Sequence, residues 1–307
     1  MKAYFKRLIK TAAGAAAFAG ASTAALAQEV GFHPWMIGLQ DAATDVMEDI
    51  HWFNGMMVWI MAIVVVFVLA LLFIVILKFN AKANPVPSRT SHNTLIEVVW
   101  TIAPILILII IAIPSFRLLY KELEIPEYDM TVKAIGYQWY WGYEYTDENM
   151  NGLYMDSIMI PEDDRAAVAE ARGQTLDQVP RLLAVDNEMV VPVDTTVRVQ
   201  VASEDVIHAF AMPAFGVKID AMPGRLNETW FRARNTGMYY GQCSELCGLN
   251  HAFMPIAIRV VTAEQFAAWS ETAQEDLEAA NKQLLAAIQA EEKVATGTIE
   301  EITVANN

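Results

Sequence analysis

The residues of this chain best suited to chemistry are two cysteines, a histidine and a methionine that lie close together in the sequence. Cys243 and Cys247 are the two cysteines of the chain, His251 follows four residues later, and Met254 follows three residues after that. Thiolate, imidazole and thioether groups are soft ligands, and a loop that leads into a strand can fold them around one point. The spacing therefore indicates a metal site that suits copper.

Several kinds of site are compatible with part of this set. Taken alone, the Cys-x3-Cys pair favours a disulfide if the loop lies in an oxidising compartment. Zinc could take two Cys and two His, but it would not need Met254. A blue-copper centre uses one Cys, so it has one thiolate fewer than this loop. Two thiolates can bridge two copper ions with one His on each, and the complete set favours this binuclear copper site.

The second histidine must come from elsewhere in the chain. Of the five His, His33 and His51 precede the first of two apolar segments, and His92 lies between these segments. His208, just after a predicted strand, is the remaining candidate in the part of the chain that carries the cysteines.

Short segments rich in Val, Tyr and Trp, separated by turn residues, surround the candidate ligands. This pattern is typical of an antiparallel sandwich or a Greek-key barrel. An acidic, Ala-rich stretch over 161–180 predicts an exposed insertion with one or two helical turns, and 263–293 predicts a surface helix followed by a frayed tail. The predicted strands are 130–145, 182–185, 189–193, 196–202, 228–232 and 254–261.

Two long apolar segments precede this region. Residues 58–77 carry no charge and are long enough to cross a bilayer. The second segment has a centre rich in Ile and Leu, flanked by Pro104 and Pro114. We therefore expect a transmembrane hairpin over 52–120, with spans at about 55–78 and 95–119.

The charges flanking the spans predict their orientation. Lys78, Lys82 and Arg89 lie in or beside the loop between the spans, which contains no acid, so this loop is expected in the cytoplasm. The basic start and Ala-rich stretch of residues 1–27 predict a signal peptide cleaved before Gln28. Residues 28–51 and the β-rich region are then expected outside.

Ionisable groups add two further expectations. Glu97, at the cytoplasmic start of the second span, is either an interfacial carboxylate that reaches water or a proton-uptake group, because ionisable residues at membrane depth often mark proton paths. The net charge is −15, and most of the acids follow residue 120. This charge argues against nucleic-acid binding and suits a basic partner.

At this point the sequence resembles a known family. Residues 243–254, CSELCGLNHAFM, resemble the CuA loop of cytochrome c oxidase subunit II, and the similarity covers about residues 50–262. The signal peptide and the acidic additions resemble bacterial aa3-type members. Further segments similar to the family are 94–101 (TLIEVVWT), 136–145 (GYQWYWGYEY), 203–208 (SEDVIH) and 220–225 (DAMPGR).

The resemblance implies a membrane-anchored all-β fold. The two-helix transmembrane hairpin would be followed by a cupredoxin-like Greek-key barrel or sandwich over 121–262, then by a C-terminal helix and tail over 263–307. The chain would lie in the bacterial inner membrane, with its N-terminus and CuA domain in the periplasm. Residues 161–180 and 263–307 have no role that the resemblance implies.

The resemblance also implies the function. CuA would accept electrons from cytochrome c and pass them to haem a in subunit I, in a complex that also contains subunit III, reduces oxygen to water and pumps protons. The haems would belong to the partner subunit alone. The implied copper ligands are His208, Cys243, Cys247, His251, Met254 and the backbone carbonyl of Glu245.

Other residues acquire roles from the same resemblance. The Glu245 carboxylate would reach a Mg²⁺ or Mn²⁺ ion shared with subunit I. Trp139 would be the point where electrons enter, and Glu97 would lie at the mouth of the K proton pathway. The cytochrome c docking acids would be Glu144, Asp186 and Asp205.

Three other classes of copper or oxidase protein fit the sequence less well. Quinol-oxidase subunit II has the same topology but lacks the copper ligands. Nitrous-oxide reductase carries CuA with a large propeller domain and no membrane hairpin. A copper-delivery protein favours exposed, exchangeable Met and Cys clusters rather than one compact loop.

Overall fold

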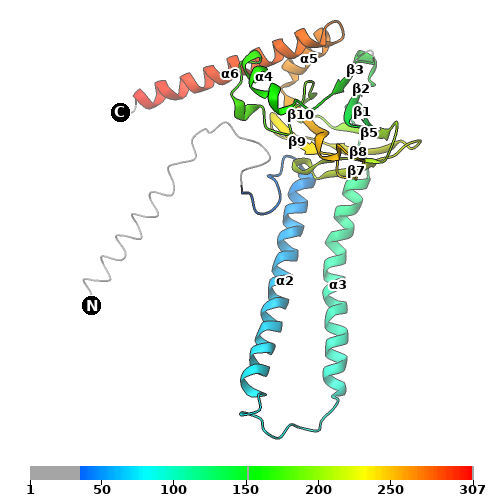
Figure 1. Cartoon of the computed structure of the whole chain (residues 1–307), viewed down its shortest axis with the longest axis vertical. Helices are drawn as coiled ribbons and strands as arrows, with labels where there is room; N and C mark the ends of the chain where they lie inside the picture. The colour runs from blue at the N-terminus through cyan, green and yellow to red at the C-terminus, as the bar shows by residue number, and fades with distance from the viewer. Residues whose placement is uncertain (1–34, 151, 306–307) are drawn as a thin grey trace.

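A computed structural model describes residues 35–150 and 152–305. A long two-helix hairpin carries a β-rich domain at one end, and further helices lie on the side of that domain away from the hairpin (Figure 1). The predicted signal peptide over 1–27 falls outside the described residues.

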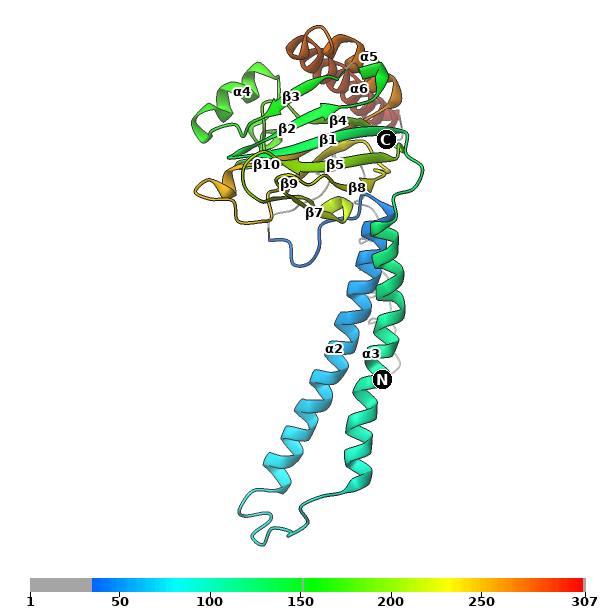
Figure 2. The same cartoon turned by 90° about the vertical axis from the view of Figure 1, so that its right-hand side faces the viewer.

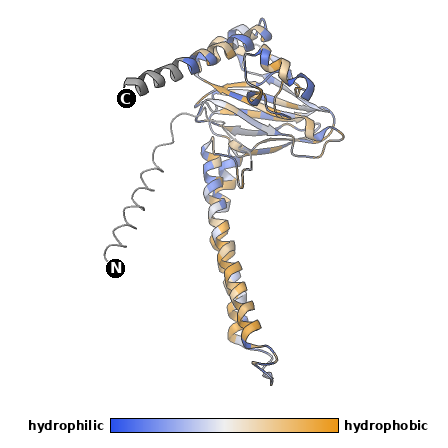
Figure 3. Ribbon diagram, turned by 60° about the vertical axis from the view of Figure 1, so that its left-hand side comes forward, coloured by the Kyte–Doolittle hydropathy of each residue, from blue (hydrophilic) through white to orange (hydrophobic). Residues whose placement is uncertain are grey.

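The hairpin consists of α2 (Asp45–Lys78) and α3 (Thr94–Leu123), which contain the two predicted apolar spans. The side chains of Thr44 and Asn93 cap the two N-termini by accepting hydrogen bonds from backbone N–H groups. Both helices expose apolar side chains along their length, as the hydropathy colouring shows (Figure 3). Such surfaces require lipid or other protein chains around them, so the prediction of two membrane helices is confirmed.

The membrane-distal end of α2 is fastened to the β domain. Val46 and Met47 are buried against it, and Thr44 Oγ1 donates a hydrogen bond of 2.8 Å to the carbonyl of Phe215. Arg234 Nη2 lies 2.7 Å from Glu48 Oε1. Since apolar burial and polar contacts act at the same place, the start of α2 has a defined position on the domain.

The β domain is built from two main sheets and a two-stranded ribbon (Figure 2). The first sheet has the order β3-β2-β1-β5-β8, the second has the order β4-β10-β9, and β6 pairs with β7. The strands are β1 (Met130–Tyr137), β2 (Tyr140–Tyr145), β3 (Tyr154–Ser157), β4 (Met189–Pro192), β5 (Val197–Ser203), β6 (His208–Met212), β7 (Val217–Ala221), β8 (Asn227–Phe231), β9 (Gly237–Gln242) and β10 (Pro255–Val261).

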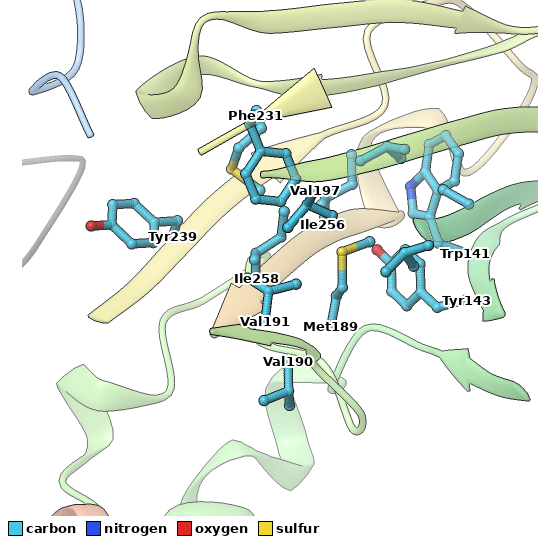
Figure 4. Close-up of a cluster of buried hydrophobic side chains, with 14 of the residues drawn as sticks. Trp141, Tyr143, Met189, Val190, Val191, Val197, Phe231, Tyr239, Ile256 and Ile258 are labelled. Carbon is cyan, nitrogen blue, oxygen red and sulfur yellow. The ribbon is translucent and has the colours of Figure 1, made fainter. Parts of the chain in front are cut away.

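The alternation of side chains along the strands builds one core between the sheets. Trp141, Tyr143 and Tyr145 point inward from β2 and are fully buried, whereas the intervening Glu144 is only half-buried. Side chains of the five-stranded sheet meet those of the three-stranded sheet in this core (Figure 4). The labelled members include Trp141, Tyr143, Met189, Val191, Val197, Phe231, Ile256 and Ile258.

The membrane-anchored sandwich is confirmed, but several details differ from the sequence-based expectations. The sheets are mixed, because β1 pairs with β5 and β4 pairs with β10 in parallel. Residues 182–185 form no strand within the described chain. They lie in a turn in which Leu182 has a positive φ, and Val185 makes one isolated bridge to Met159. The sequence analysis also missed β3, β6, β7 and β9.

The helices beyond the sheets also refine the expectations. The insertion contains α4 (Arg165–Ala171) between two short 3-10 helices, as predicted for an exposed segment with a few helical turns. The predicted single C-terminal helix is instead two helices, α5 (Ala263–Ala273) and α6 (Leu277–Ala305). Asp276 explains the break, because its carboxylate accepts the N–H of Ala279 and so caps the start of α6.

A buried ion pair crosses the second sheet near these helices. Arg259 of β10 is 7% exposed and donates to both carboxylate oxygens of Glu188, with one distance of 2.8 Å. A bidentate pair of this kind provides the guanidinium, which is largely removed from water, with charged hydrogen-bond partners. Removing one partner leaves a buried charge without compensation.

We expect Glu188→Gln to lower the free energy of unfolding by about 3 kcal/mol, because Arg259 stays charged and loses its counter-charge. For a domain of this size the loss corresponds to a fall of about 8 °C in Tm. Thermal unfolding of the purified chain, followed by near-ultraviolet circular dichroism, measures it. Glu170→Gln makes the same change on the exposed face of α4 and should leave Tm unchanged. Equal Tm values for both variants would contradict the prediction.

Candidate metal centre

The predicted ligands lie in the loop between β9 and β10. Gln242 at the end of β9 pairs directly with Pro255 at the start of β10, so the loop over 243–254 leaves and returns at one place. Cys243 N donates 3.3 Å to the carbonyl of Met254 and closes the loop at its base. A short 3-10 helix, His251–Phe253, turns the chain back toward the sheet. The antiparallel pairing therefore gathers residues that are up to eleven positions apart.

The loop and the start of β6 bring six donor groups together. The two cysteine Sγ atoms lie 3.9 Å apart and form the middle of the group. Around Cys243 Sγ are His208 Nδ1 at 3.9 Å and the Glu245 carbonyl oxygen at 3.3 Å. Around Cys247 Sγ are His251 Nδ1 at 3.5 Å and Met254 Sδ at 3.5 Å.

This arrangement fits copper better than a disulfide or a zinc site. Both cysteines are free, and a sulfur separation of 3.9 Å is far from the ~2.05 Å of a disulfide bond. The ligand atoms of His208, Cys243 and Cys247 all lie within 4.8 Å of one another. Met254 Sδ adds a thioether that zinc would not need. The sulfur atoms, the imidazoles and a carbonyl thus form a soft donor set around two neighbouring positions.

His208 is held in one orientation by Asp205. The ring is fully buried, with Nδ1 toward the cysteines and Nε2 at 2.8 Å from Asp205 Oδ1. Asp205 also accepts a hydrogen bond of 2.7 Å from the backbone N of Gln138 through its other oxygen. A carboxylate on the outer nitrogen keeps the proton there, so the inner nitrogen is free to bind a metal.

The charges of the cluster are strongly unequal when no metal neutralises them. Burial raises the pKa of the Cys243 thiol, but hydrogen bonding to His208 and to the backbone around Glu245 outweighs burial and lowers this pKa to about 6. Burial and the charge of Cys243 raise the pKa of Cys247 to about 12. One thiol is therefore a thiolate at neutral pH, and its charge keeps the other protonated.

Two glycines make room for the cluster. A Cβ added at Gly136 of β1 would lie 2.8 Å from Cδ2 of the buried His208 ring, which has no free space to move into. Gly248 has a φ of +121°, a conformation that favours glycine, and a Cβ there would meet Trp139 and Gln138 at 3.1 Å. Glycine is therefore favoured at Gly136 because the His208 ring lies close, and at Gly248 because its φ is positive.

Tryptophans hold the middle and the end of the ligand loop. Trp139 lies in the turn between β1 and β2, is half-buried, and donates from Nε1 to the carbonyl of Cys247 at 3.2 Å. Gln138 Nε2 donates to the same carbonyl at 2.8 Å. Trp141 is fully buried and donates from Nε1 to the carbonyl of Met254 at 3.3 Å. Of these two tryptophans, Trp139 is thus the one that reaches the surface.

The predicted acidic residues are spread over several places. The Glu245 side chain is exposed on the ligand loop. Glu144 lies on β2 opposite Lys133 of β1, and their charged groups are 3.7 Å apart. Asp186 follows the insertion and accepts backbone hydrogen bonds from Ile158 and Asn187. Glu97 is in the first turn of α3, at the opposite end of a helix ~40 Å long, so it is not part of this cluster.

The sequence analysis missed the residues that support the ligands. Gln138 and Gly136 lie in the segment 136–145, which is rich in aromatic residues, and nothing in their own residue types marked them as parts of the site. Asp205 was identified as a docking acid, yet the structure gives it a second task as the partner of His208. The spacing of three residues between Asp205 and His208 is a signal that could have indicated this contact.

Comparison with known proteins agrees with this architecture. The model of the family "Cytochrome C oxidase subunit II, periplasmic domain" matches residues 130–261, and that of the "transmembrane domain" of the same subunit matches residues 32–118. "Probable cytochrome c oxidase subunit 2" of Rickettsia bellii is 51% identical over 236 residues, which are 77% of this chain and 83% of the relative. Cytochrome c oxidase subunit 2 of Cereibacter sphaeroides is 47% identical over 268 residues, covering 82% and 87%.

A solved structure is also similar. The periplasmic domain of subunit II of the Bradyrhizobium japonicum cytochrome oxidase is 58% identical. The match covers 50% of this chain and 99% of that domain, with a TM-score of 0.43.

We expect the two thiols of the metal-free chain to titrate far apart. Ultraviolet thiolate absorbance should show one ionisation near pH 6, which Cys243→Ser removes, and no second ionisation until far above neutral pH. In Cys243→Ser, the pKa of Cys247 should fall, because the charge that helps to raise it is gone. Equal titration of both thiols near pH 8 or 9 would contradict the unequal environments.

Proposed function

The chain belongs to the cytochrome c oxidase subunit II family, and we propose that it holds the binuclear copper centre CuA as the electron-accepting subunit of its oxidase. In this proposal it receives electrons from cytochrome c and passes them to haem a in subunit I, where they support oxygen reduction to water and proton pumping. The single observation that carries the proposal is the convergence of six donor groups, two of which are cysteine sulfur atoms 3.9 Å apart.

The donors divide into two groups, one around each sulfur atom. His208 Nδ1 and the Glu245 carbonyl lie beside Cys243, whereas His251 Nδ1 and Met254 Sδ lie beside Cys247. The bound copper ions would supply a carrier for one electron. The protein holds these donors in fixed orientations, so little would have to move when the charge changes.

Trp139 is the proposed point where electrons enter. Its half-buried indole contacts the backbone of the ligand Cys247 through a hydrogen bond of 3.2 Å. This contact gives a short path from the surface to a copper ligand. Gln138 fixes the same carbonyl, so the path does not depend on the indole alone.

Further proposed roles concern the partner subunits. The exposed Glu245 carboxylate is free to reach a Mg²⁺ or Mn²⁺ ion shared with subunit I, while the carbonyl of the same residue faces Cys243. Glu97, half-buried at the loop end of α3, suits the mouth of the K proton pathway. The exposed apolar faces of α2 and α3 offer surface to lipid, subunit I and subunit III.

The proposed orientation places the β domain in the periplasm of a bacterial inner membrane. The loop between α2 and α3 carries Lys82 and Arg89 and no acid, which favours the cytoplasm. The β domain lies at the other end of the hairpin (Figure 1), on the side where a soluble cytochrome c would dock.

The copper proposal is tested by metal analysis and EPR of the purified chain. We expect two coppers per chain sharing one unpaired electron in the oxidised form. Gly136→Ala should reduce copper content and alter the spectrum, because the added methyl group collides with the His208 ring. Gly55→Ala on α2 is the matched control, since its backbone has no positive φ and a Cβ there meets nothing within 4 Å.

Two results would overturn the copper proposal. One is a single copper per chain with a blue-type spectrum, and the other is a metal-free chain with a Cys243–Cys247 disulfide. Loss of copper from both glycine variants would instead contradict the specific role given to Gly136.

Docking of cytochrome c is tested with Glu144→Gln combined with Asp186→Asn. Because rim charges mainly change association rates, kcat/KM for cytochrome c should fall about fivefold at low salt. The difference should vanish near 1 M salt, where the screening length is ~3 Å. Turnover of the oxidase complex over a range of ionic strength measures both effects.

Asp205 is kept out of that variant because its change would also disturb His208. Asp205→Asn should alter the EPR spectrum, whereas the double variant should not. Glu271→Gln combined with Glu278→Gln removes the same charge from the exposed surfaces of α5 and α6 and serves as the control. A double variant that behaves like the parent at every ionic strength would remove Glu144 and Asp186 from the docking surface.

A further inference from the structure

The two segments without a role in the family, 161–180 and 263–307, meet on one side of the β domain. In Figure 1, α6 passes beside α4, near β9 and β10. Gln289 Nε2 of α6 donates to the carbonyls of Arg172 and Gly173, directly after α4, at 2.9 and 3.1 Å. These bonds fix α6 against the insertion, so the two segments form one structural unit.

A cavity lies between this unit and the second sheet. Its volume is about 500 Å³, within the range of sites that hold small molecules. Its wall includes Met238 near the start of β9 and Val260 near the end of β10. The metal loop instead connects the end of β9 to the start of β10. A strand of this length spans ~17 Å, so the cavity is separate from the metal centre.

The cavity has an apolar wall. Leu285 and Ile288 lie three residues apart on α6, on one face of the helix, and both line the space. Val260 and Met238 contribute apolar surface from the sheet. A hydrocarbon chain of a few carbons would find contacts on both sides.

The charged groups of the lining are mostly acidic. Asp177, Glu291 and Glu292 line the cavity, together with one cation, Arg259. Arg259 is already paired with the half-buried Glu188 through a bidentate contact and also interacts with the charge of Glu292. The lining therefore carries excess negative charge, which attracts a cation and repels an anion.

We propose that this cavity binds a small aliphatic amine. The ammonium group is attracted by the carboxylates of Asp177 and Glu291. The hydrocarbon chain lies against Leu285 and Ile288. Each property of the lining thus selects one part of the ligand: the acids select positive charge, and the apolar wall selects alkyl groups.

The test is isothermal titration calorimetry of the purified oxidase complex in lipid nanodiscs, with n-butylamine as the probe. We expect saturable binding that weakens as salt is added. n-Butanol and butyrate have the same alkyl group without the positive charge, so they should bind about tenfold more weakly or not at all. From ethylamine to n-butylamine, affinity should rise about threefold per methylene group.

Two variants separate binding in the cavity from attraction to the acidic surface. Ile288→Trp fills the cavity and should abolish binding. Asp177→Asn combined with Glu291→Gln should weaken binding at least about threefold. Glu278→Gln, which removes one carboxylate from α6 outside the cavity lining, should leave affinity unchanged. The visible spectrum and cytochrome c turnover of each variant show whether the complex has assembled, and if Ile288→Trp does not assemble, the double variant decides.

Several outcomes would overturn the proposal. These are n-butanol binding as tightly as n-butylamine, affinity independent of chain length, unchanged binding in the double variant, and equal weakening in Glu278→Gln. None of these measurements depends on copper or on electron transfer, so the proposed function and the amine site can fail separately.

Discussion

Two buried thiols whose sulfur atoms lie 3.9 Å apart cannot both carry a charge unless a cation lies between them. In the metal-free chain, hydrogen bonding to His208 outweighs burial and lowers the pKa of Cys243 to about 6, while burial and the charge of Cys243 raise the pKa of Cys247 to about 12. The rest of the site follows from this constraint. His208 and His251 present nitrogen atoms beside the sulfurs, and Met254 adds an uncharged thioether, so the surroundings supply donors without adding further negative charge.

The scaffold maintains this crowded arrangement through the backbone. Trp139 and Gln138 hold the carbonyl of Cys247, Trp141 holds that of Met254, and the pairing of β9 with β10 closes the base of the loop. Each of these groups comes from a strand or a tight turn of the core rather than from a mobile surface segment. A site that must stay nearly the same in two charge states benefits from supports of this kind, because motion of the ligands would oppose rapid electron transfer.

The sequence allowed the ligand loop to be predicted because four side-chain ligands lie within residues 243–254 and are of unusual types for one short segment. His208 followed from the small number of histidines, although β6, which carries it, was missed: β6 is short and buried throughout, so it shows no alternation. The opposite error at 182–185 arose because apolar residues in a turn resemble a short strand. Parallel pairing of β1 with β5 and the space left by Gly136 depend on contacts distant in sequence, which residue types do not reveal. The bond of Asp205 to His208 is local, and its three-residue spacing could have indicated it.

The roles of individual acidic residues were also not predictable from the sequence. A net charge of −15 predicts attraction to a basic partner, but it does not say which carboxylates act at long range and which act within one hydrogen bond. Asp205 is the clearest case: its oxygens are engaged by His208 and by the backbone of Gln138, and these hydrogen bonds outweigh the effect of burial and lower the pKa of this carboxyl group. The charge of Asp205 contributes to the negative electrostatic potential of the domain, whereas its hydrogen bond orients the proposed ligand His208. A carboxylate with both tasks cannot be assigned to docking from turnover alone, because its removal changes the field and the ligand geometry together.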